Sequence, residues 1–165
     1  MAIHGGRPSN RQIAPSLFVR NAGRAIEFYQ RAFDAVLLYR SPMPGGVGIF
    51  AQMRIGDSTI QIADESPPDD VEPDSPRSPQ SLGGYSVVFE RYVDDVDAAF
   101  KQAVDAGATP TLPPEDMFFG DRYCWLTDPF GHRWALATVK QTLTPEQIDA
   151  NIEQHLAEYE RKELQ

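Results

Sequence analysis

The chain has 165 residues, enough for one domain of ordinary size that buries about 70% of its unfolded surface. Hydrophobic residues make up 41% of it, which argues against disorder. The 24 acidic and 15 basic side chains give a formal charge of −9, and this negative charge disfavours nucleic acid and anionic membranes as partners. With Cys124 as its one cysteine, no signal-peptide core and no apolar run near the ~20 residues that span a bilayer, the chain is predicted to be cytoplasmic.

The first third of the chain predicts one strand, a helix and three further strands. Residues 13–19 are the first expected strand, and Asn21 then caps an amphipathic helix that runs to about Asp34. Prolines and glycines at 42–46 predict a turn, and Gly56-Asp57 predicts a hairpin. The remaining strands are expected at 35–40, 47–55 and 58–63. The helix is expected to bury the stripe Ala25, Phe28, Tyr29, Ala32 and Phe33.

Residues 64–84 differ from the rest of the chain in composition. They hold five prolines, six acids and almost nothing apolar, so this stretch is predicted to be an exposed connector. The functional alternative is a mobile lid over a site.

The second half repeats the pattern of the first. A strand at 85–93 leads to Asp95, which caps a helix ended by Gly107. A short strand is expected at 108–112, a loop at 113–122, and strands at 123–127 and 133–138 around the turn 128–131. Tyr29–Ala35 matches Phe100–Ala106 and Ile60–Ala63 aligns with Trp134–Ala137, so two copies of one module are predicted, at about 11–63 and 85–138.

A final helix is predicted at about 144–162. Thr144 is the cap, Pro145 opens the first turn, and Gln147 occupies the capping-box position. The apolar stripe Ile148, Ile152, Leu156 and Tyr159 is expected to be buried against the domain itself or against a second subunit.

Three features of the chain point to one known family: the order βαβββ–βαβββ, the strand ends Val-Arg-Asn21 and Val-Asp-Asp95, and the hairpin Asp128-Pro-Phe-Gly-His-Arg-Trp134. In these features the chain resembles the vicinal oxygen chelate superfamily, which includes glyoxalase I, bleomycin-resistance proteins and extradiol dioxygenases. The segments 54–57, 81–84, 113–117 and 120–123 resemble its PhnB-like branch. The resemblance implies one α+β domain over residues 1–165. Its two βαβββ modules are expected to form an open, incomplete barrel around a cleft, followed by the C-terminal helix. It also implies a homodimer.

The resemblance also implies where a metal ion would be held. In the metalloenzymes of the superfamily, the ligands come from the first and last strand of each module, which places them at Ala14, Gln61, Val88 and Ala135. Three of these positions have no donor atom, so no metal and no other cofactor is expected. Where the branch often has His-Ala-Glu, this chain has Phe50-Ala-Gln52. An oxygen-liganded ion held by Glu90, Gln52 and Gln61 is the alternative. His4, His132 and His155 are not placed to act as ligands.

Catalytic candidates are few. Cys124 lies inside a strand and is expected to be a buried structural thiol. Glu90 is the best acid–base candidate, because enclosure by Phe50 and Tyr92 would raise its pKa. The alternative is an exposed Glu90 paired with Arg91 or Arg122.

Residues 113–122 and the strand after them combine aromatic faces with charges, as pockets for small organic ligands do. The structural alternative is that Phe118 and Phe119 plug the open end of the barrel while Asp121 and Arg122 pair across a turn. The full predicted ligand-binding set is Phe18, Phe50, Gln52, Gln61, Glu90, Tyr92, Phe118, Phe119, Asp121, Arg122, Tyr123 and Trp125.

The sequence therefore predicts a metal-independent small-molecule-binding protein, with an aromatic or cationic compound as its ligand and neither nucleic acid nor membrane as partner. The alternative is a glyoxalase-type lyase or isomerase, or a dioxygenase, that uses a divalent metal or Glu90 as base.

Overall fold

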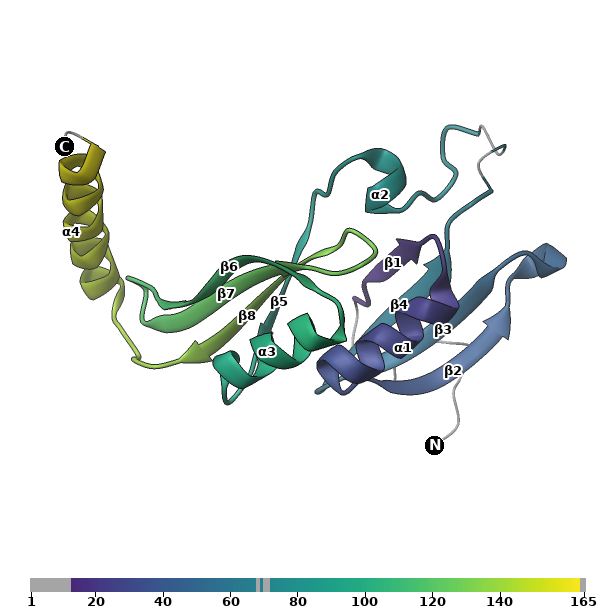
Figure 1. Cartoon of the computed structure of the whole chain (residues 1–165), viewed down its shortest axis with the longest axis horizontal. Coiled ribbons are helices and arrows are strands. Elements are labelled where there is room, and N and C mark those ends of the chain that lie inside the picture. Colours follow the sequence, from purple (N-terminus) through teal and green to yellow (C-terminus); the bar gives the residue numbers. More distant parts are fainter. Residues whose placement is uncertain (1–12, 68, 70–71, 164–165) are drawn as a thin grey trace.

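The computed structural model describes residues 13–67, 69 and 72–163, which form two four-stranded sheets (Figure 1). The first module, module 1, contains β1 (Ser16–Val19), α1 (Ala22–Phe33), β2 (Val36–Pro42), the 3-10 turn η1 (Pro44–Gly46), β3 (Ile49–Ile55) and β4 (Ser58–Asp64). Its strand order is β1-β4-β3-β2, with β1 parallel to β4 and the other pairs antiparallel.

Helix α1 forms for the reasons that the sequence indicates. The Asn21 side chain accepts a hydrogen bond of 2.9 Å from the backbone N–H of Arg24, and the helix ends at Asp34, which adopts the left-handed conformation with φ 54°. All five residues of the predicted stripe are buried, which confirms the face that the helix turns to the sheet.

The connector holds a short helix, α2 (Pro79–Leu82), that the sequence did not predict. Most of the connector's described residues are exposed or half-buried, but Ser78 is fully buried. The Glu65 carboxylate accepts hydrogen bonds from the Ser78 N–H (2.7 Å) and the Ser81 hydroxyl (2.8 Å), and Arg20 lies 3.4 Å from it. These bonds hold α2 beside the end of β4.

Module 2 repeats the topology. It contains β5 (Val88–Tyr92), α3 (Val96–Ala106), β6 (Thr109–Asp116), β7 (Asp121–Thr127) and β8 (Arg133–Val139), in the order β5-β8-β7-β6. Asp95 caps α3 through the N–H of Ala98 at 3.0 Å, and β5 is parallel to β8 as β1 is to β4. The predicted duplication and the α+β class are confirmed, with strand ends that differ from prediction by a few residues.

One larger correction concerns β6. The sequence predicts a strand at 108–112 and a loop at 113–122, yet β6 continues to Asp116 and β7 already begins at Asp121. Register shifts between Pro110 and Leu112 and between Leu112 and Glu115 accommodate the prolines. Because β6 is the edge strand, the N–H groups that proline lacks are not needed for pairing on its outer side.

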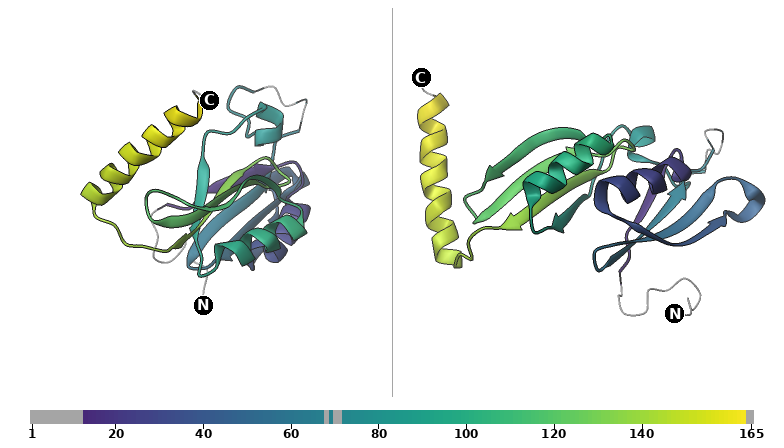
Figure 2. Two further views of the ribbon diagram at one scale, coloured as in Figure 1. Left: turned by 60° about the vertical axis from the view of Figure 1, so that its left-hand side comes forward. Right: turned by 60° about the horizontal axis from the view of Figure 1, so that its bottom comes forward.

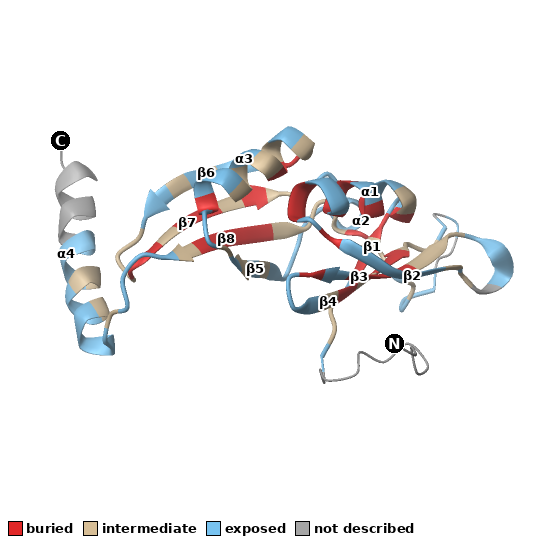
Figure 3. Ribbon diagram, turned by 90° about the horizontal axis from the view of Figure 1, so that it is seen from below, coloured by how far each residue is buried: buried red, intermediate tan, exposed pale blue. Residues whose placement is uncertain are grey.

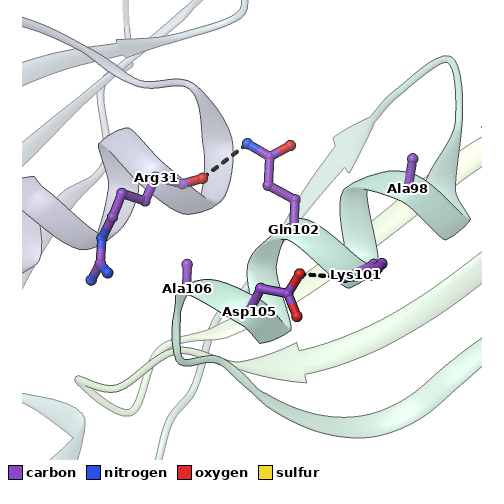
Figure 4. A pocket seen from close by; sticks show the side chains of 6 residues that line it. All are labelled: Arg31, Ala98, Lys101, Gln102, Asp105 and Ala106. Atoms are coloured by element: carbon purple, nitrogen blue, oxygen red, sulfur yellow. Dashed lines mark hydrogen bonds and ion pairs between the residues drawn. The ribbon is translucent and has the colours of Figure 1, made fainter.

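One core joins the two modules. Helix α1 packs against α3, where the Gln102 amide donates a 2.9 Å hydrogen bond to the carbonyl of Arg31 (Figure 4). Buried rings continue across the junction, with the centroids of Phe33 and Trp134 4.6 Å apart. Figure 3 shows the buried residues running from one module into the other beneath the two helices.

Helices α1 and α3 lie on the same side of the molecule, and the two sheets lie one after the other along its length (Figure 2). The two sheets do not close into a barrel. Each sheet packs its helix, α1 or α3, on one face, and no described helix covers its other face. We call the latter the free face of each module.

Helix α4 (Pro145–Glu163) stands off at one end of the molecule (Figure 1). Its predicted capping box is confirmed: the Gln147 side chain accepts from the Thr144 N–H at 2.8 Å, and the Thr144 hydroxyl accepts from the Gln147 N–H at 3.3 Å. Burial of its stripe against the domain is not found, since Leu156 is 55% exposed and Ile148 and Ile152 are half-buried. The Tyr159 side chain lies outside the described part. No described helix is long and apolar enough to cross a membrane.

Candidate functional site

The free face of module 2 carries most of the predicted ligand-binding residues. Residues directly opposite each other on neighbouring strands share a face. The register sets Glu90 and Trp125 opposite Ala135 on either side of β8. It likewise sets Tyr92 and Tyr123 opposite Ala137 and places Asp121 opposite Val139. The free face therefore holds Glu90, Tyr92, Asp121, Tyr123, Trp125, Arg133, Ala135 and Ala137.

Apolar side chains on this face form a cluster of their own, separate from the main core. Tyr123, Ala135 and Ala137 are buried, and Met117, Phe119 and Trp125 pack against them. The rings of Phe119 and Tyr123 meet edge to face at 5.6 Å. We call these six residues the aromatic cluster. No described helix covers the aromatic cluster.

Two carboxylates and a phenol border the aromatic cluster. The Tyr92 hydroxyl donates a 3.1 Å hydrogen bond to Asp121, which is only 8% exposed. Partial desolvation, together with hydrogen bonding to Glu90 and Asp121 and their negative charge, raises the pKa of Tyr92 to about 12. Tyr92 therefore stays protonated near neutral pH and can act there only as a hydrogen-bond donor or acceptor.

Glu90 is not enclosed as the catalytic hypothesis requires. Its side chain is exposed, and Phe50, which was expected to cover it, belongs to β3 of the other sheet. The alternative partners do not pair with it either, since no ion pair between described residues joins Glu90 to Arg91 or Arg122.

Arg122 and Phe118 point away from the free face. The Arg122 guanidinium binds Asp97 at the start of α3 (2.7 and 2.8 Å) and Asp116 (3.2 Å), on the helix side of β7. It does not pair with Asp121, which lies on the opposite face. Phe118 turns toward α4, where its ring lies 5.6 Å from that of His155 and its carbonyl accepts a 2.8 Å bond from Asn151.

The four predicted residues of module 1 form a second group. Phe18 and Phe50 flank Ala63, and Gln52 lies opposite Gln61, all on the free face of module 1. Gln61 accepts a 2.7 Å hydrogen bond from the Ser16 hydroxyl, while Gln52 is buried, with 3% of its surface exposed. The predicted set is thus divided between two sheets of one chain.

The residues at the implied metal positions do not fit a divalent ion. Ala14 precedes β1, Val88 begins β5, and Ala135 is fully buried, so only Gln61 offers a donor. Within the described ranges, no group of three His, Cys, Asp or Glu side chains is arranged to hold an ion. His4 lies outside those ranges.

Cys124 and His132 have structural surroundings. Cys124 is fully buried, and burial raises the pKa of its thiol to about 11, so it is not a ready nucleophile. A ring nitrogen of His132 lies 3.1 Å from the Phe18 carbonyl, which joins the β7–β8 turn to β1.

Arg133 is a residue that the sequence reasoning missed. Its guanidinium carbon lies 4.8 Å from the ring centroid of Trp125 and 5.6 Å from that of Tyr85. The available signal was its spacing of two from Ala135 along a strand, which places both on one face.

Two grooves of about 430 Å³ lie elsewhere on the surface. The one between α1 and α3 is lined by Arg31, Ala98, Lys101, Gln102, Asp105 and Ala106, so it has no aromatic wall (Figure 4). The other lies between the β3–β4 hairpin and β5 and includes Glu90 and Tyr92, which connects it to the border of the aromatic cluster. The second groove is therefore the more suitable extension of a ligand site.

Comparison with known proteins finds a matching family model and close sequence relatives. Residues 11–136 match the family model described as Glyoxalase/Bleomycin resistance protein/Dioxygenase superfamily. The uncharacterized proteins Rv0887c of Mycobacterium tuberculosis and Mb0911c of Mycobacterium bovis are each 41% identical to this chain over 138 residues. That alignment covers 84% of this chain and 80% and 90% of theirs.

Solved structures share the fold. TioX from Micromonospora sp. ML1 superposes with a TM-score of 0.61 at 24% identity, covering 79% of this chain and 99% of that one. A glyoxalase/bleomycin resistance protein/dioxygenase from Nocardioides gives a TM-score of 0.60 at 20% identity, covering 84% and 90%. At these identities the likeness concerns the fold alone.

Proposed function

Because this chain belongs to the glyoxalase/bleomycin resistance protein/dioxygenase superfamily, we propose that it binds a small organic molecule on the free face of module 2 without a metal ion. The aromatic cluster is the observation that carries this proposal. An apolar floor bordered by a few polar groups is the usual composition of a small-molecule site. The polar groups here are Glu90, Asp121 and Tyr92.

A thermal-shift screen of small aromatic compounds tests this function. Compounds that bind are expected to raise the melting temperature of the wild-type protein and of Tyr39→Ala, but not of Trp125→Ala. Tyr39 is the matched control, because it is an exposed aromatic residue on the sheet of module 1. If every stabilising compound acts equally on Trp125→Ala, the free face of module 2 is not the site.

The second candidate function is that of a glyoxalase-type lyase or isomerase, or a dioxygenase. It is favoured by Glu90, an exposed carboxylate that lines a groove beside Tyr92. Metal analysis of protein purified without an affinity tag, followed by addition of Mn, Ni, Zn or Fe, separates the two functions. Metal-free binding predicts no stoichiometric uptake, whereas tight uptake that Glu90→Gln abolishes would overturn metal-free binding in favour of the second function.

We also propose that the chain is a homodimer, with a second copy covering surfaces that one chain leaves open. Leu156 on α4 is 55% exposed, and the aliphatic residues Val36, Leu37 and Leu38 of β2 are 37–43% exposed. Light scattering at micromolar concentration is expected to give twice the chain mass. If α4 contributes to the interface, Ile152→Lys shifts the mass toward the monomer and the neighbouring Glu153→Lys does not. A monomeric wild-type protein would contradict the proposal.

Two finer assignments depend on the sequence alone. The segments at 54–57, 81–84, 113–117 and 120–123 are the ground for placing the chain in the PhnB-like branch. The cytoplasmic location stays a prediction from composition.

A further inference from the structure

We propose that Arg133 binds a carboxylate of the molecule that occupies the free face of module 2. This inference rests on the proposed function and deepens it by naming a chemical group that the ligand carries. It depends on how the guanidinium is stacked, on which of its donors lack acceptors, and on where the other charges of this face lie.

The faces of the Arg133 guanidinium are engaged by aromatic rings. It lies over Trp125 on the neighbouring strand β7 and over Tyr85 just before β5, with 4.8 and 5.6 Å between the guanidinium carbon and the ring centroids. Stacking of this kind leaves the edges of the planar group available for hydrogen bonds in its own plane. A carboxylate, which is also planar, matches such an edge with two parallel bonds.

The hydrogen bonds of Arg133 are incomplete. One terminal nitrogen, Nη1, donates to the Thr127 hydroxyl at 3.2 Å, while the buried Nε has no acceptor among the described residues. None of the ion pairs in that part of the chain includes Arg133. A buried donor without an acceptor is costly and calls for an explanation.

Arg122, in the same sheet, is an arginine whose three side-chain nitrogens all donate hydrogen bonds to carboxylates. Its Nε and Nη2 both donate to Asp97, at 2.7 and 2.8 Å, and Nη1 donates to Asp116. The two arginines come from neighbouring strands but opposite faces. Among the described residues, carboxylates pair with the arginine on the helix side, and none forms an ion pair with the arginine on the free face.

Of the two acids on the free face, only Asp121 stands far from Arg133, because Glu90 lies opposite Ala135, two residues along β8 from Arg133, and forms no ion pair with it. Arg133 pairs in register with Val88 and Thr127, whereas Asp121 lies opposite Val139 at the other end of the strands. The rise of an extended strand puts the two ends about 20 Å apart along β8. A ligand carboxylate at Arg133 therefore avoids Asp121, and the rest of the ligand extends over the aromatic cluster.

The test uses two probes of the same shape, 2-naphthoate and its neutral amide, 2-naphthamide. We expect 2-naphthoate to bind the wild-type protein at least tenfold more tightly. It is also expected to shift the NMR signal of the Arg133 Nε–H, which is identified by its absence in Arg133→Lys. In Arg133→Lys the preference for the carboxylate is expected to fall below about threefold. Arg54→Lys, an exposed arginine on the sheet of module 1, is the matched control and is expected to keep the wild-type preference.

The outcomes separate this inference from the proposed function. Equal binding of both probes that Trp125→Ala abolishes would overturn the role of Arg133 and leave the small-molecule site in place. A carboxylate preference that persists in folded Arg133→Lys, as judged by circular dichroism, would also overturn it. Failure of both probes, together with a negative thermal-shift screen, would overturn the inference and the proposed function alike.

Discussion

At the scale of single residues, Asp128 joins the two modules. Its buried carboxylate accepts hydrogen bonds from Tyr29 of α1 (2.6 Å) and from the Trp134 indole (3.0 Å), as well as from the backbone N–H groups of Phe130 and His132. Tyr29→Phe is expected to lower the free energy of unfolding by about 2 kcal/mol, because the bond is to a charged acceptor. Urea unfolding measures it. Tyr39→Phe, on an exposed tyrosine, is the control and should change stability by less than about 0.5 kcal/mol.

His132 belongs to the same scale and predicts a pH dependence. Burial lowers its pKa, so the folded protein disfavours the charged imidazolium while the unfolded chain accepts the proton at the ordinary value, about 6.5. The unfolded state binds more protons below that pH, so this stabilising contribution is complete above about 6.5 and is lost on acidification. His132→Gln is expected to flatten the decline in unfolding free energy between pH 7 and pH 5, measured by urea titration. An unchanged slope would show that other groups cause it.

At the scale of elements, the same capping chemistry should have different consequences in α1 and α4. Asn21→Ala is expected to lower the free energy of unfolding by about 1 kcal/mol, because α1 is packed into the common core. Thr144→Ala removes one bond of the α4 capping box, but among its described side chains α4 bonds to Phe118 through Asn151 and packs against it through His155, outside the common core. It should reduce helical circular dichroism while leaving the urea midpoint unchanged. A shifted midpoint would mean that α4 is coupled to the core, directly or through a second copy.

At the scale of the whole molecule, the continuous core predicts one cooperative unfolding transition for both modules. Phe130 lies in the β7–β8 turn of module 2, and its ring packs against Phe28 and Tyr29 of module 1 at 6.0 and 6.3 Å. Phe130→Ala is expected to cost about 3–5 kcal/mol. Tryptophan fluorescence reports module 2, which holds both tryptophans, and far-ultraviolet circular dichroism reports both modules. The two signals should coincide in the wild-type protein, and separate transitions there would contradict a shared core.

The sequence alone determined the three longer helices α1, α3 and α4, their caps, the hairpins and the duplication of the module, but not the short helix α2. These features depend on residues close together in the chain, through the periodicity of apolar side chains and local hydrogen bonds to backbone N–H groups. It also indicated that β7 and the loop before it supply an aromatic surface. It failed where strand pairing overrides local composition: β6 extends through its prolines because it is an edge strand paired with β7.

Only the tertiary structure decided which side chains meet. Arg122 and Arg133 are both arginines on strands, yet strand register turns one toward Asp97 on α3 and the other toward Trp125 on the free face. Phe118 and Phe119 are adjacent, and the turn sends one to α4 and the other to Tyr123. A shift of one residue along a strand reverses the face of a side chain, and that choice is made by burial against the rest of the molecule.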